Sequence, residues 1–151
     1  MCRSKVFMMT ERDNLAARIH AARILVVDDD IDALDLMETV LTQHGYSNVY
    51  VASDSTAVAE MFQLAPCDLV LLDMDMPHLN GIAVMRQVRE ELQAGDYMPV
   101  IVVSGSSDAQ NRRLAWKEGA RDYISKPFNV EEFLQRVHNQ LEVRMLFKAR
   151  S

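Results

Sequence analysis

Five residues with charged or nucleophilic side chains lie at or just after the ends of short apolar runs: Asp28, Asp29, Asp73, Ser104 and Lys126. Three of these runs are continuous in Val, Ile and Leu, as strands covered on both faces require. In an open parallel sheet, ligands bind outside the carboxyl ends of the strands. The sequence therefore predicts that three carboxylates, a hydroxyl and an ammonium group meet in one crevice.

The predicted crevice has the composition of a site for a hard cation and a phosphoryl group. Three carboxylates brought together at neutral pH repel one another unless a cation lies between them. Oxygen ligands without His or Cys in the pattern favour Mg²⁺. With Lys126 as a second positive charge and Ser104 as a hydrogen-bond donor, a phosphoryl group on one carboxylate would be held on three sides. We infer a phosphoryl-accepting aspartate.

Each of these residues also has an ordinary structural explanation when it is taken alone. The acidic triplet 28–30 could complement a helix dipole, with Asp30 as the N-cap. Asp73 and Asp75 could form a turn before Pro77, and Lys126 could be a solvated surface lysine. Independent turns would rarely place these groups at the ends of four strands, so their joint placement favours a site.

The elements that position these residues alternate between strand and helix, which is typical of an α/β fold with a parallel sheet. The predicted strands are residues 24–27, 49–52, 69–72, 100–103 and 123–124. The strand 49–52 is the least apolar and is expected at an edge. The predicted helices begin after the acidic triplet, after an Asp54 cap and after Gly81, and then cover about 108–118 and 130–150.

Two extensions flank this alternating region. In residues 1–22, Thr10 is positioned to cap a short helix with Leu15, Ile19 and Ala22 on one face. At the other end, the last helix runs to about residue 150 without Gly or Pro. The spacing of its side chains allows either a coiled-coil seam or a frayed amphipathic tail. The seam would be formed by Leu134, Val137, Leu141 and Arg144.

The composition limits the class of protein. The chain has 151 residues, of which 49% are hydrophobic, so one domain with a substantial core is expected. A net charge of −6 disfavours direct nucleic-acid binding, which depends on clustered Lys and Arg. Cys2 and Cys67 lie in no paired motif, as expected in a reducing cytosol. No apolar run is long enough for a membrane span. We expect a cytoplasmic protein.

Four motifs resemble the receiver domain of two-component response regulators, the family that includes chemotaxis regulators. They are the acidic pair after 25–27, the segment Asp73-Met74-Asp75-Met76-Pro77 with Asn80-Gly81, the triplet Val103-Ser104-Gly105, and the segment 123–128 around Lys126-Pro127. The resemblance covers about residues 23–140. It implies a flavodoxin-like (βα)5 three-layer sandwich with strand order 2-1-3-4-5. Residues 1–22 are then an N-terminal extension, and 141–151 extend the last helix, as a linker would.

The resemblance also implies a role for each motif residue. Asp73 stands four residues before Pro77 and is similar in position to the phosphoacceptor. Asp29, Asp73 and the backbone carbonyl of Asp75 would ligate Mg²⁺, with Asp28 acting through a bound water. Ser104 would be the switch hydroxyl, Tyr123 the aromatic residue that responds to it, and Lys126 the phosphoryl-binding lysine. Asp75 and Ser106 occupy positions that tune the lifetime of the phosphoryl group.

The implied function is a phosphorylation-dependent signalling switch rather than a classical enzyme, because such a domain catalyses only its own phosphorylation and dephosphorylation. Its phosphodonor would be a sensor histidine kinase or a phosphotransfer protein. Phosphorylation would change the face made by the helix 108–118, the strand 123–124 and the helix 130–150. That face would act on a downstream output domain or protein, and it also allows a homodimer.

Two competing functions are compatible with parts of the pattern. A phosphatase of the haloacid dehalogenase type also has an Asp-x-Asp sequence after an apolar strand, as in Asp73-Met74-Asp75. That family places its nucleophile early and its magnesium-binding acids late, whereas here the acidic pair comes first. The other alternative is a receiver-like module that binds partners without phosphorylation. Such modules usually lack one of the acids or the lysine, and this chain has the full set.

Overall fold

The molecule is built around a five-stranded parallel sheet with the order β2-β1-β3-β4-β5. The computed structural model describes residues 10–74, 81–92, 95–105 and 109–150. The strands are β1 (Arg23–Val27), β2 (Asn48–Ala52), β3 (Leu69–Leu72), β4 (Val100–Ser104) and β5 (Asp122–Ser125). The predicted α/β class, the strand order and the edge position of β2 are confirmed.

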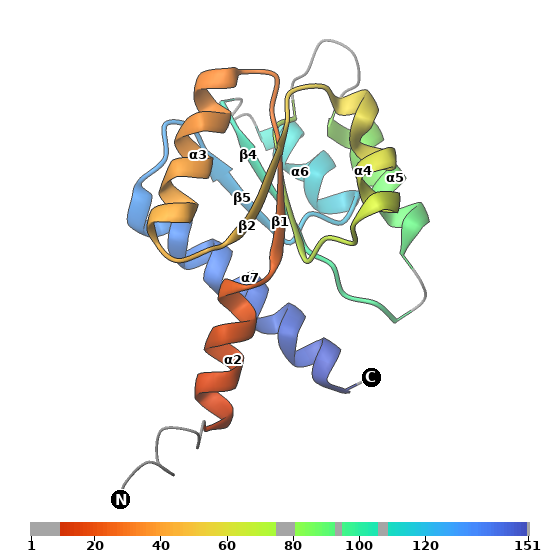
Figure 1. Cartoon of the computed structure of the whole chain (residues 1–151). Helices are drawn as coiled ribbons and strands as arrows, with labels where there is room; N and C mark the ends of the chain where they lie inside the picture. The colour runs from red at the N-terminus through yellow and green to blue at the C-terminus, as the bar shows by residue number, and fades with distance from the viewer. Residues whose placement is uncertain (1–9, 75–80, 93–94, 106–108, 151) are drawn as a thin grey trace, which may run out of the picture.

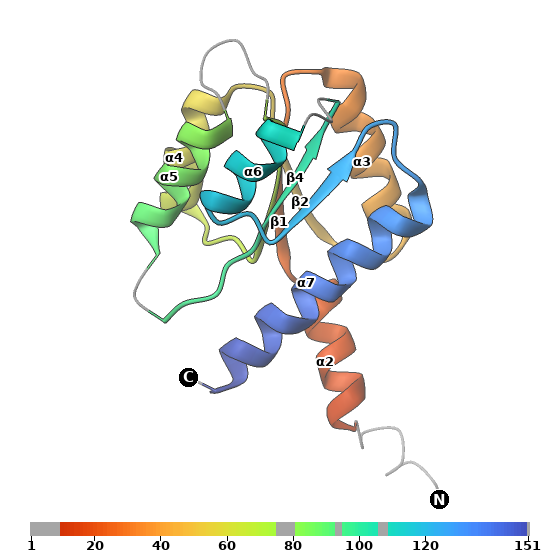
Figure 2. The same ribbon diagram turned by 180° about the vertical axis from the view of Figure 1, so that it is seen from behind.

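Helices cover both faces of the sheet (Figures 1 and 2). Those in the described part of the chain are α2 (Glu11–His20), α3 (Ile31–Gln43), the 3₁₀ turn η1 (Ser55–Ala57), α4 (Val58–Leu64), α5 (Gly81–Glu91), α6 (Ala109–Lys117) and α7 (Val130–Arg150). Two apolar cores result, one under α3 and α7 and the other under α4, α5 and α6. This is the predicted three-layer sandwich.

Strand β1 shows why the strands are continuously apolar. Its side chains alternate between the faces of the sheet, so Ile24 and Val26 enter the core under α3 and α7. Leu25 and Val27 enter the opposite core, and all four side chains are buried. Each such side chain contributes roughly 1.5–3 kcal/mol on burial. A strand with helices on both faces gains this at every position, which favours the interior position of β1, between β2 and β3.

The helix starts agree with the predicted caps at two of three positions. Thr10 caps α2 in a reciprocal capping box with Asp13, and Asp30 caps α3 by accepting from the Asp32 N–H. The predicted Asp54 cap of the next helix is wrong. Asp54 accepts from the backbone and the hydroxyl of Thr56 instead, and this tight turn starts η1. Helix α4 begins afterwards without a side-chain cap.

Helix α7 continues to Arg150, as the absence of Gly and Pro predicted. The coiled-coil seam predicted on it is wrong. Val137 and Leu141 are fully buried against the protein's own core, and Arg144 is also buried. These side chains face the sheet and are unavailable to a second helix. The last turns stay helical and project past the sheet, so a frayed tail does not describe them either.

The predicted N-terminal helix is present as α2, which crosses α7 below the sheet (Figures 1 and 2). Ile19 and Ala22 are buried in the core, and Arg18 Nη2 donates to the Met145 carbonyl at 3.2 Å. The extension thus packs against the domain through the second half of α2, whereas residues 10–14 are exposed. In the described part of the chain, no helix is both long and apolar enough to cross a membrane.

Candidate functional site

The two aspartates that follow β1 and β3 are fixed by the backbone at one edge of the sheet. The Asp28 N–H donates to the Ala52 carbonyl at 3.1 Å, and the Asp73 N–H donates to the Val27 carbonyl at 3.0 Å. Each bond extends a parallel ladder one step beyond the strand. The side chains of Asp28 and Asp73 therefore leave the sheet side by side at its carboxyl end, as predicted.

Three carboxylates meet at this edge. Oxygen atoms of Asp28, Asp29 and Asp73 all lie within 4.8 Å of one another. Asp28 is fully buried and Asp73 nearly so, whereas Asp29 is exposed. Two like charges at this separation repel by about 3 kcal/mol at an effective dielectric constant of about 20. Oxygen-only donors that converge in this way form a cradle suited to a hard divalent cation.

Lys126 reaches this edge from the end of β5. Its Nζ lies 2.6 Å from Asp28 Oδ2, and its side chain is mostly covered. The other oxygen of Asp28 accepts the Asp30 N–H at 3.0 Å. Both oxygens of Asp28 are therefore engaged, one of them by the ammonium group. The solvated surface position considered for Lys126 is wrong.

Ser104 is the last residue of β4, and its side chain is completely buried. Its carbonyl accepts the Lys126 N–H at 2.9 Å, which continues the ladder between β4 and β5. The Lys126–Pro127 peptide bond is cis. The backbone bond between Lys126 and Ser104 thus places both residues at the edge of the sheet that carries the aspartates.

Gly81 holds the chain close to Asp73 at the start of α5. Its N–H donates to the Met74 carbonyl at 2.9 Å. A Cβ at this position would lie 2.8 Å from Met74 Cα and 2.9 Å from the Asp73 carbonyl oxygen, closer than real Cβ contacts allow. No side chain fits here without moving the backbone that carries Asp73, which gives a physical reason for the Gly in the motif.

Tyr123 is buried in β5 and lies beside the core under α4, α5 and α6. The guanidinium of Arg112, from α6, lies 5.0 Å from the centre of the Tyr123 ring. Arg112 Nη2 also donates to Ser125 Oγ at 3.0 Å. These contacts tie α6 to β5, so a change at Tyr123 would be felt at the surface of α6.

The charged residues on the β5 and α7 side are paired within the chain. Arg136 lies 2.5 Å from Asp122 Oδ1 and 3.0 Å from Glu132 Oε1. The first bond joins β5 to α7, and the second is an i,i+4 pair on α7.

Two predicted site residues, Asp75 and Ser106, lie outside the described residues, and their metal and lifetime roles stay predictions.

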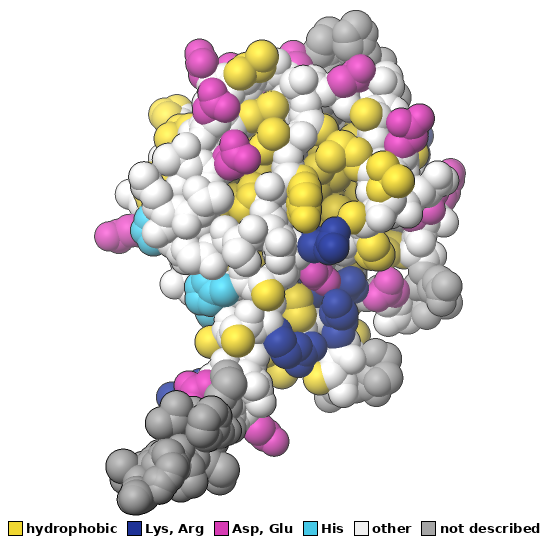
Figure 3. Space-filling view, in the orientation of Figure 1, with side chains coloured by type: hydrophobic (Ala, Val, Ile, Leu, Met, Phe, Trp, Pro, Cys, Tyr) yellow, Lys and Arg dark blue, Asp and Glu magenta, His cyan; other side chains and the backbone are white. Residues whose placement is uncertain are grey.

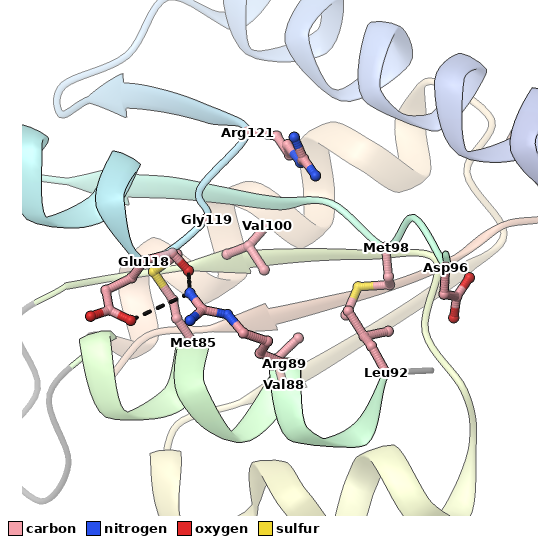
Figure 4. A pocket seen from close by; sticks show the side chains of 10 residues that line it. All are labelled: Met85, Val88, Arg89, Leu92, Asp96, Met98, Val100, Glu118, Gly119 and Arg121. Atoms are coloured by element: carbon pink, nitrogen blue, oxygen red, sulfur yellow. Dashed lines mark hydrogen bonds and ion pairs between the residues drawn. The ribbon is translucent and has the colours of Figure 1, made fainter. Parts of the chain in front are cut away.

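A hollow of about 140 Å³ at the opposite end of α5 lacks the features of a reactive site (Figure 4). Its most prominent charged groups are already paired, because Arg89 donates to both the carbonyl and the carboxylate of Glu118. Arg86 donates to the same carboxylate at 2.8 Å, and these contacts lower the pKa of Glu118. We assign this hollow to the packing of α5 against the end of α6.

A second hollow lies beside β2 and α4, where hydrophobic side chains gather on the surface (Figure 3). Its lining includes Tyr50, Leu64 and Cys67, and it is almost entirely apolar. Burial, assisted by the charge of Asp68, raises the pKa of the Cys67 thiol to about 11. A thiol with that pKa is a poor nucleophile at neutral pH. Cys67 is therefore a small buried residue of the core.

Sequence reasoning missed a buried ion-pair network at the amino end of the strands. Asp68 Oδ1 accepts from Arg144 Nε at 3.0 Å and from Lys148 Nζ at 3.2 Å, and its Oδ2 accepts the Arg23 N–H at 2.9 Å. Arg144 also donates to Asp96 Oδ1 at 3.0 Å. A basic pair at i,i+4 on the predicted last helix was the available signal for this network.

Comparison with known proteins gives a consistent family. The family model described as the response regulator receiver domain matches residues 24–138. Among curated proteins, the chain is 36% identical over 119 residues to the DNA-binding response regulator MtrA of Mycolicibacterium paratuberculosis. It is 35% identical over 118 residues to the TorCAD operon transcriptional regulatory protein TorR of Escherichia coli O157:H7. These matches cover 79% and 78% of the chain, but 51% and 49% of the relatives, so the chain spans about half their length.

Solved structures agree with this family. A CheY-like response regulator receiver domain protein from Methanospirillum hungatei JF-1 superposes with a TM-score of 0.75 at 28% identity. This match covers 83% of the chain and 97% of that structure. A response regulator receiver domain protein from Clostridium thermocellum gives a TM-score of 0.74 at 32% identity, covering 83% and 98%.

Proposed function

The chain belongs to the response regulator receiver domain family, and from this premise we propose that it is a phosphorylation-dependent switch whose phosphoacceptor is Asp73. The observation that carries the proposal is the meeting of Asp73 with Asp28, Asp29 and Lys126 at one edge of the sheet. Family membership argues against the haloacid dehalogenase alternative, since the relatives are signalling proteins.

We propose that Asp28, Asp29 and Asp73 hold Mg²⁺ together with the backbone carbonyl of Asp75. The donor set supports this, because Mg²⁺ prefers carboxylate and carbonyl oxygens and keeps several waters. Asp28 is engaged by Lys126, so Asp29 and Asp73 are the direct protein carboxylates and Asp28 acts through water. When bound, the ion offsets carboxylate repulsion and the charge of the transferring phosphoryl oxygens.

In the proposed reaction, a carboxylate oxygen of Asp73 attacks the phosphorus of a phosphohistidine or a small acyl phosphate. The new bond is O–P on Asp73, and the bond that breaks joins phosphorus to the donor, which leaves with its electron pair. Lys126 shifts its ammonium contact from Asp28 toward the equatorial phosphoryl oxygens, where negative charge is spread. The product is an acyl phosphate, and the domain would catalyse only its own phosphorylation and dephosphorylation.

The phosphoryl group would act on Ser104 and Tyr123 next. We propose that the Ser104 hydroxyl turns to donate to a phosphoryl oxygen, and that Tyr123 responds to this movement. The contact between Arg112 and the Tyr123 ring supports this, because it links β5 to the exposed surface of α6. The face made by α6, β5 and α7 would then be the output surface.

The partners follow from this switch. A sensor histidine kinase or a phosphotransfer protein would supply the phosphoryl group, and a downstream output domain or protein would recognise the changed face. The relatives are named as DNA-binding or transcriptional regulators, and this chain matches about half of their length. With a net charge of −6, the chain would influence nucleic acid only through such an output partner. A homodimer through the face of α6, β5 and α7 remains part of the proposal.

Intact mass spectrometry tests this proposal. The wild-type chain and Asp73→Asn are incubated with acetyl phosphate, with and without Mg²⁺. We expect one phosphoryl adduct on the wild-type chain that requires Mg²⁺ and is absent from the variant. Asp96→Asn is the matched control, because Asp96 is an exposed carboxylate far from the acidic edge. An adduct of equal yield on Asp73→Asn would refute the phosphoacceptor assignment.

A further inference from the structure

The most unusual surface of the molecule lies where α2 crosses the end of α7, below the sheet (Figures 1 and 2). A groove between the two helices is lined by Arg12 and Leu15 of α2 and by Glu142, Leu146 and Ala149 of α7. We call this the α2/α7 groove. All of these residues lie outside 24–138, the range that the receiver family model matches. The groove is therefore formed by the two segments that flank the matched region.

The α7 side of the groove exposes large apolar side chains. Val143, Leu146 and Phe147 are 37%, 50% and 43% exposed, and they fall within two turns of one helix. Leu146 lines both the groove and a shallow hollow that it shares with Val143 and Phe147. Scattered apolar residues are normal on a surface, but clusters of them mark contact sites.

The two helices are held in place by buried contacts, and Phe147 is in addition stacked on Tyr97, with ring centres 5.0 Å apart. The inner side of α7 is already anchored by Met145, which is buried, and by Arg144 with its ion pairs. Helix α2 is anchored by Ile19 in the core and by the bond from Arg18 to Met145. The groove is thus preformed on two fixed helices, and a partner that binds there pays little ordering entropy.

The charges along the groove favour a second copy of this chain as the occupant. Arg12 and Glu142 stand on opposite sides of the groove, and among the described residues neither is ion-paired to the other helix. In the described part of the chain, Glu142 Oε2 lies 3.4 Å from His138 Nε2 on its own helix. A surface with both signs at its rim is self-complementary under a two-fold rotation, since Arg12 of one copy can meet Glu142 of the other.

Other occupants fit the charges less well. A nucleic acid would need a basic surface, and this groove carries acidic as well as basic side chains on a chain of net charge −6. Association of two chains with this net charge is opposed by long-range repulsion, so it requires a patch that is locally balanced and apolar. The α2/α7 groove meets both requirements.

We propose that the α2/α7 groove is a homodimer interface that buries Leu146 of each copy against the other and pairs Arg12 with Glu142 across the two-fold axis. The interface lies at the end of the sheet opposite Asp73, so it leaves the acidic edge open to a phosphodonor. It is distinct from the face of α6, β5 and α7. It also does not depend on phosphorylation.

Sedimentation velocity over a range of concentrations tests this proposal with two matched variants. Leu146→Glu places a charge in the groove, and Leu114→Glu places the same charge on α6, where Leu114 is 41% exposed. For the unphosphorylated chain, we expect a dimer of the wild type, an increase of at least about tenfold in the dissociation constant for Leu146→Glu, and no change for Leu114→Glu. Thermal melts establish that both variants are folded.

Exchanging the charges of Arg12 and Glu142 distinguishes a specific ion pair across the dimer from a general destabilisation of the interface. Arg12→Glu and Glu142→Arg should each weaken the dimer, and the double variant should restore it, because both cross-axis pairs are rebuilt with opposite polarity. A wild-type chain that stays monomeric at every concentration would overturn the proposal and leave the groove to a different protein. Loss of the dimer in Leu114→Glu, with Leu146→Glu unaffected, would overturn it in favour of the α6 face.

Discussion

The two ends of the central sheet hold aspartates in opposite electrostatic surroundings. At the amino end, Asp68 accepts from Arg144, Lys148 and a backbone N–H, and Arg144 is paired with Asp96 as well. At the carboxyl end, three carboxylates lie within 4.8 Å of one another, and Lys126 forms an ion pair with Asp28. One end has matched charges, and the other has a concentration of negative charge.

This difference separates residues that stabilise the fold from residues that bind. Hydrogen bonds and nearby cations lower the pKa of Asp68 even though its burial alone would raise that pKa. Both oxygens of the Asp68 carboxylate therefore have hydrogen-bond partners from the protein itself and need no ligand. The acidic edge costs stability through repulsion between its carboxylates, and in the proposed function a bound cation would offset that cost. Substitutions at the two ends should accordingly have opposite effects.

The largest effect is expected from Arg144→Ala at the amino end. This change leaves the buried Asp68 carboxylate without its main side-chain partner, which costs about 3–5 kcal/mol of unfolding free energy. Lys148→Ala is the control, because Lys148 is half exposed and should contribute less than about 1 kcal/mol. Urea denaturation measures both. Equal losses in the two variants would show that burial of Arg144 is irrelevant.

Gly81→Ala tests the backbone that carries Asp73. The new methyl group would overlap Met74 Cα and the Asp73 carbonyl, so we expect a loss of about 2 kcal/mol and slower phosphorylation by acetyl phosphate. Gly105→Ala is the matched control at the same edge, since a Cβ there meets no described atom within 4 Å. Its stability should change by less than about 0.5 kcal/mol. If both variants behave like wild type, the close approach at Gly81 is not a constraint.

Replacing an Asp by Asn should change the free energy of unfolding in opposite directions at the two ends of the sheet. Asp68→Asn removes a matched charge and should lower the unfolding free energy by about 2 kcal/mol. Asp29→Asn removes repulsion at the acidic edge and should raise that free energy by about 1 kcal/mol in metal-free buffer. Chemical denaturation in EDTA compares the two variants. Two changes of the same sign would contradict the electrostatic distinction.

The smallest expected effect is the pH dependence of the stability that Asp68 contributes. Because the folded pKa of Asp68 is lowered, its carboxylate contributes stability that is fully present above the unfolded pKa of about 3.9 and is lost as pH falls through the folded value. The stability difference between wild type and Asp68→Asn should therefore be constant from neutral pH to about 5 and shrink below about 4. Denaturation at several pH values measures it. A difference that grows in acid would contradict the lowered pKa.

The sequence predicted the acidic edge well because its signals are local. Each chemical residue follows a short apolar run, and parallel strands bring such positions together by topology alone. The meeting of Asp28, Asp29 and Asp73 and the approach of Lys126 needed no knowledge of side-chain packing. The roles of these residues in phosphorylation stay predictions.

The amino-end network and the α2/α7 groove could not be predicted in the same way. Asp68 and Arg144 are 76 positions apart, and the helical spacing that placed Arg144 on one face with Val137 and Leu141 did not identify its partner. The sequence also did not show what the side chains of 134–144 pack against, so their spacing was compatible with a coiled-coil seam. Helix caps were harder to predict where a nearby side chain competes. The Asp54 carboxylate accepts from the Thr56 hydroxyl and starts a 3₁₀ turn instead of capping α4. Long-range pairing and local competition both require coordinates.

The effect of Mg²⁺ on the melting temperature tests the central claim most directly. If the acidic edge is a cation site, Mg²⁺ should raise the melting temperature of the wild-type chain through preferential binding to the folded state. The rise should be strongly reduced in Asp29→Asn, yet it should be unchanged in Arg144→Ala, whose melting temperature is lower throughout. A rise of equal size in all three proteins, or none in the wild type, would contradict the claim that these carboxylates are gathered to bind a cation.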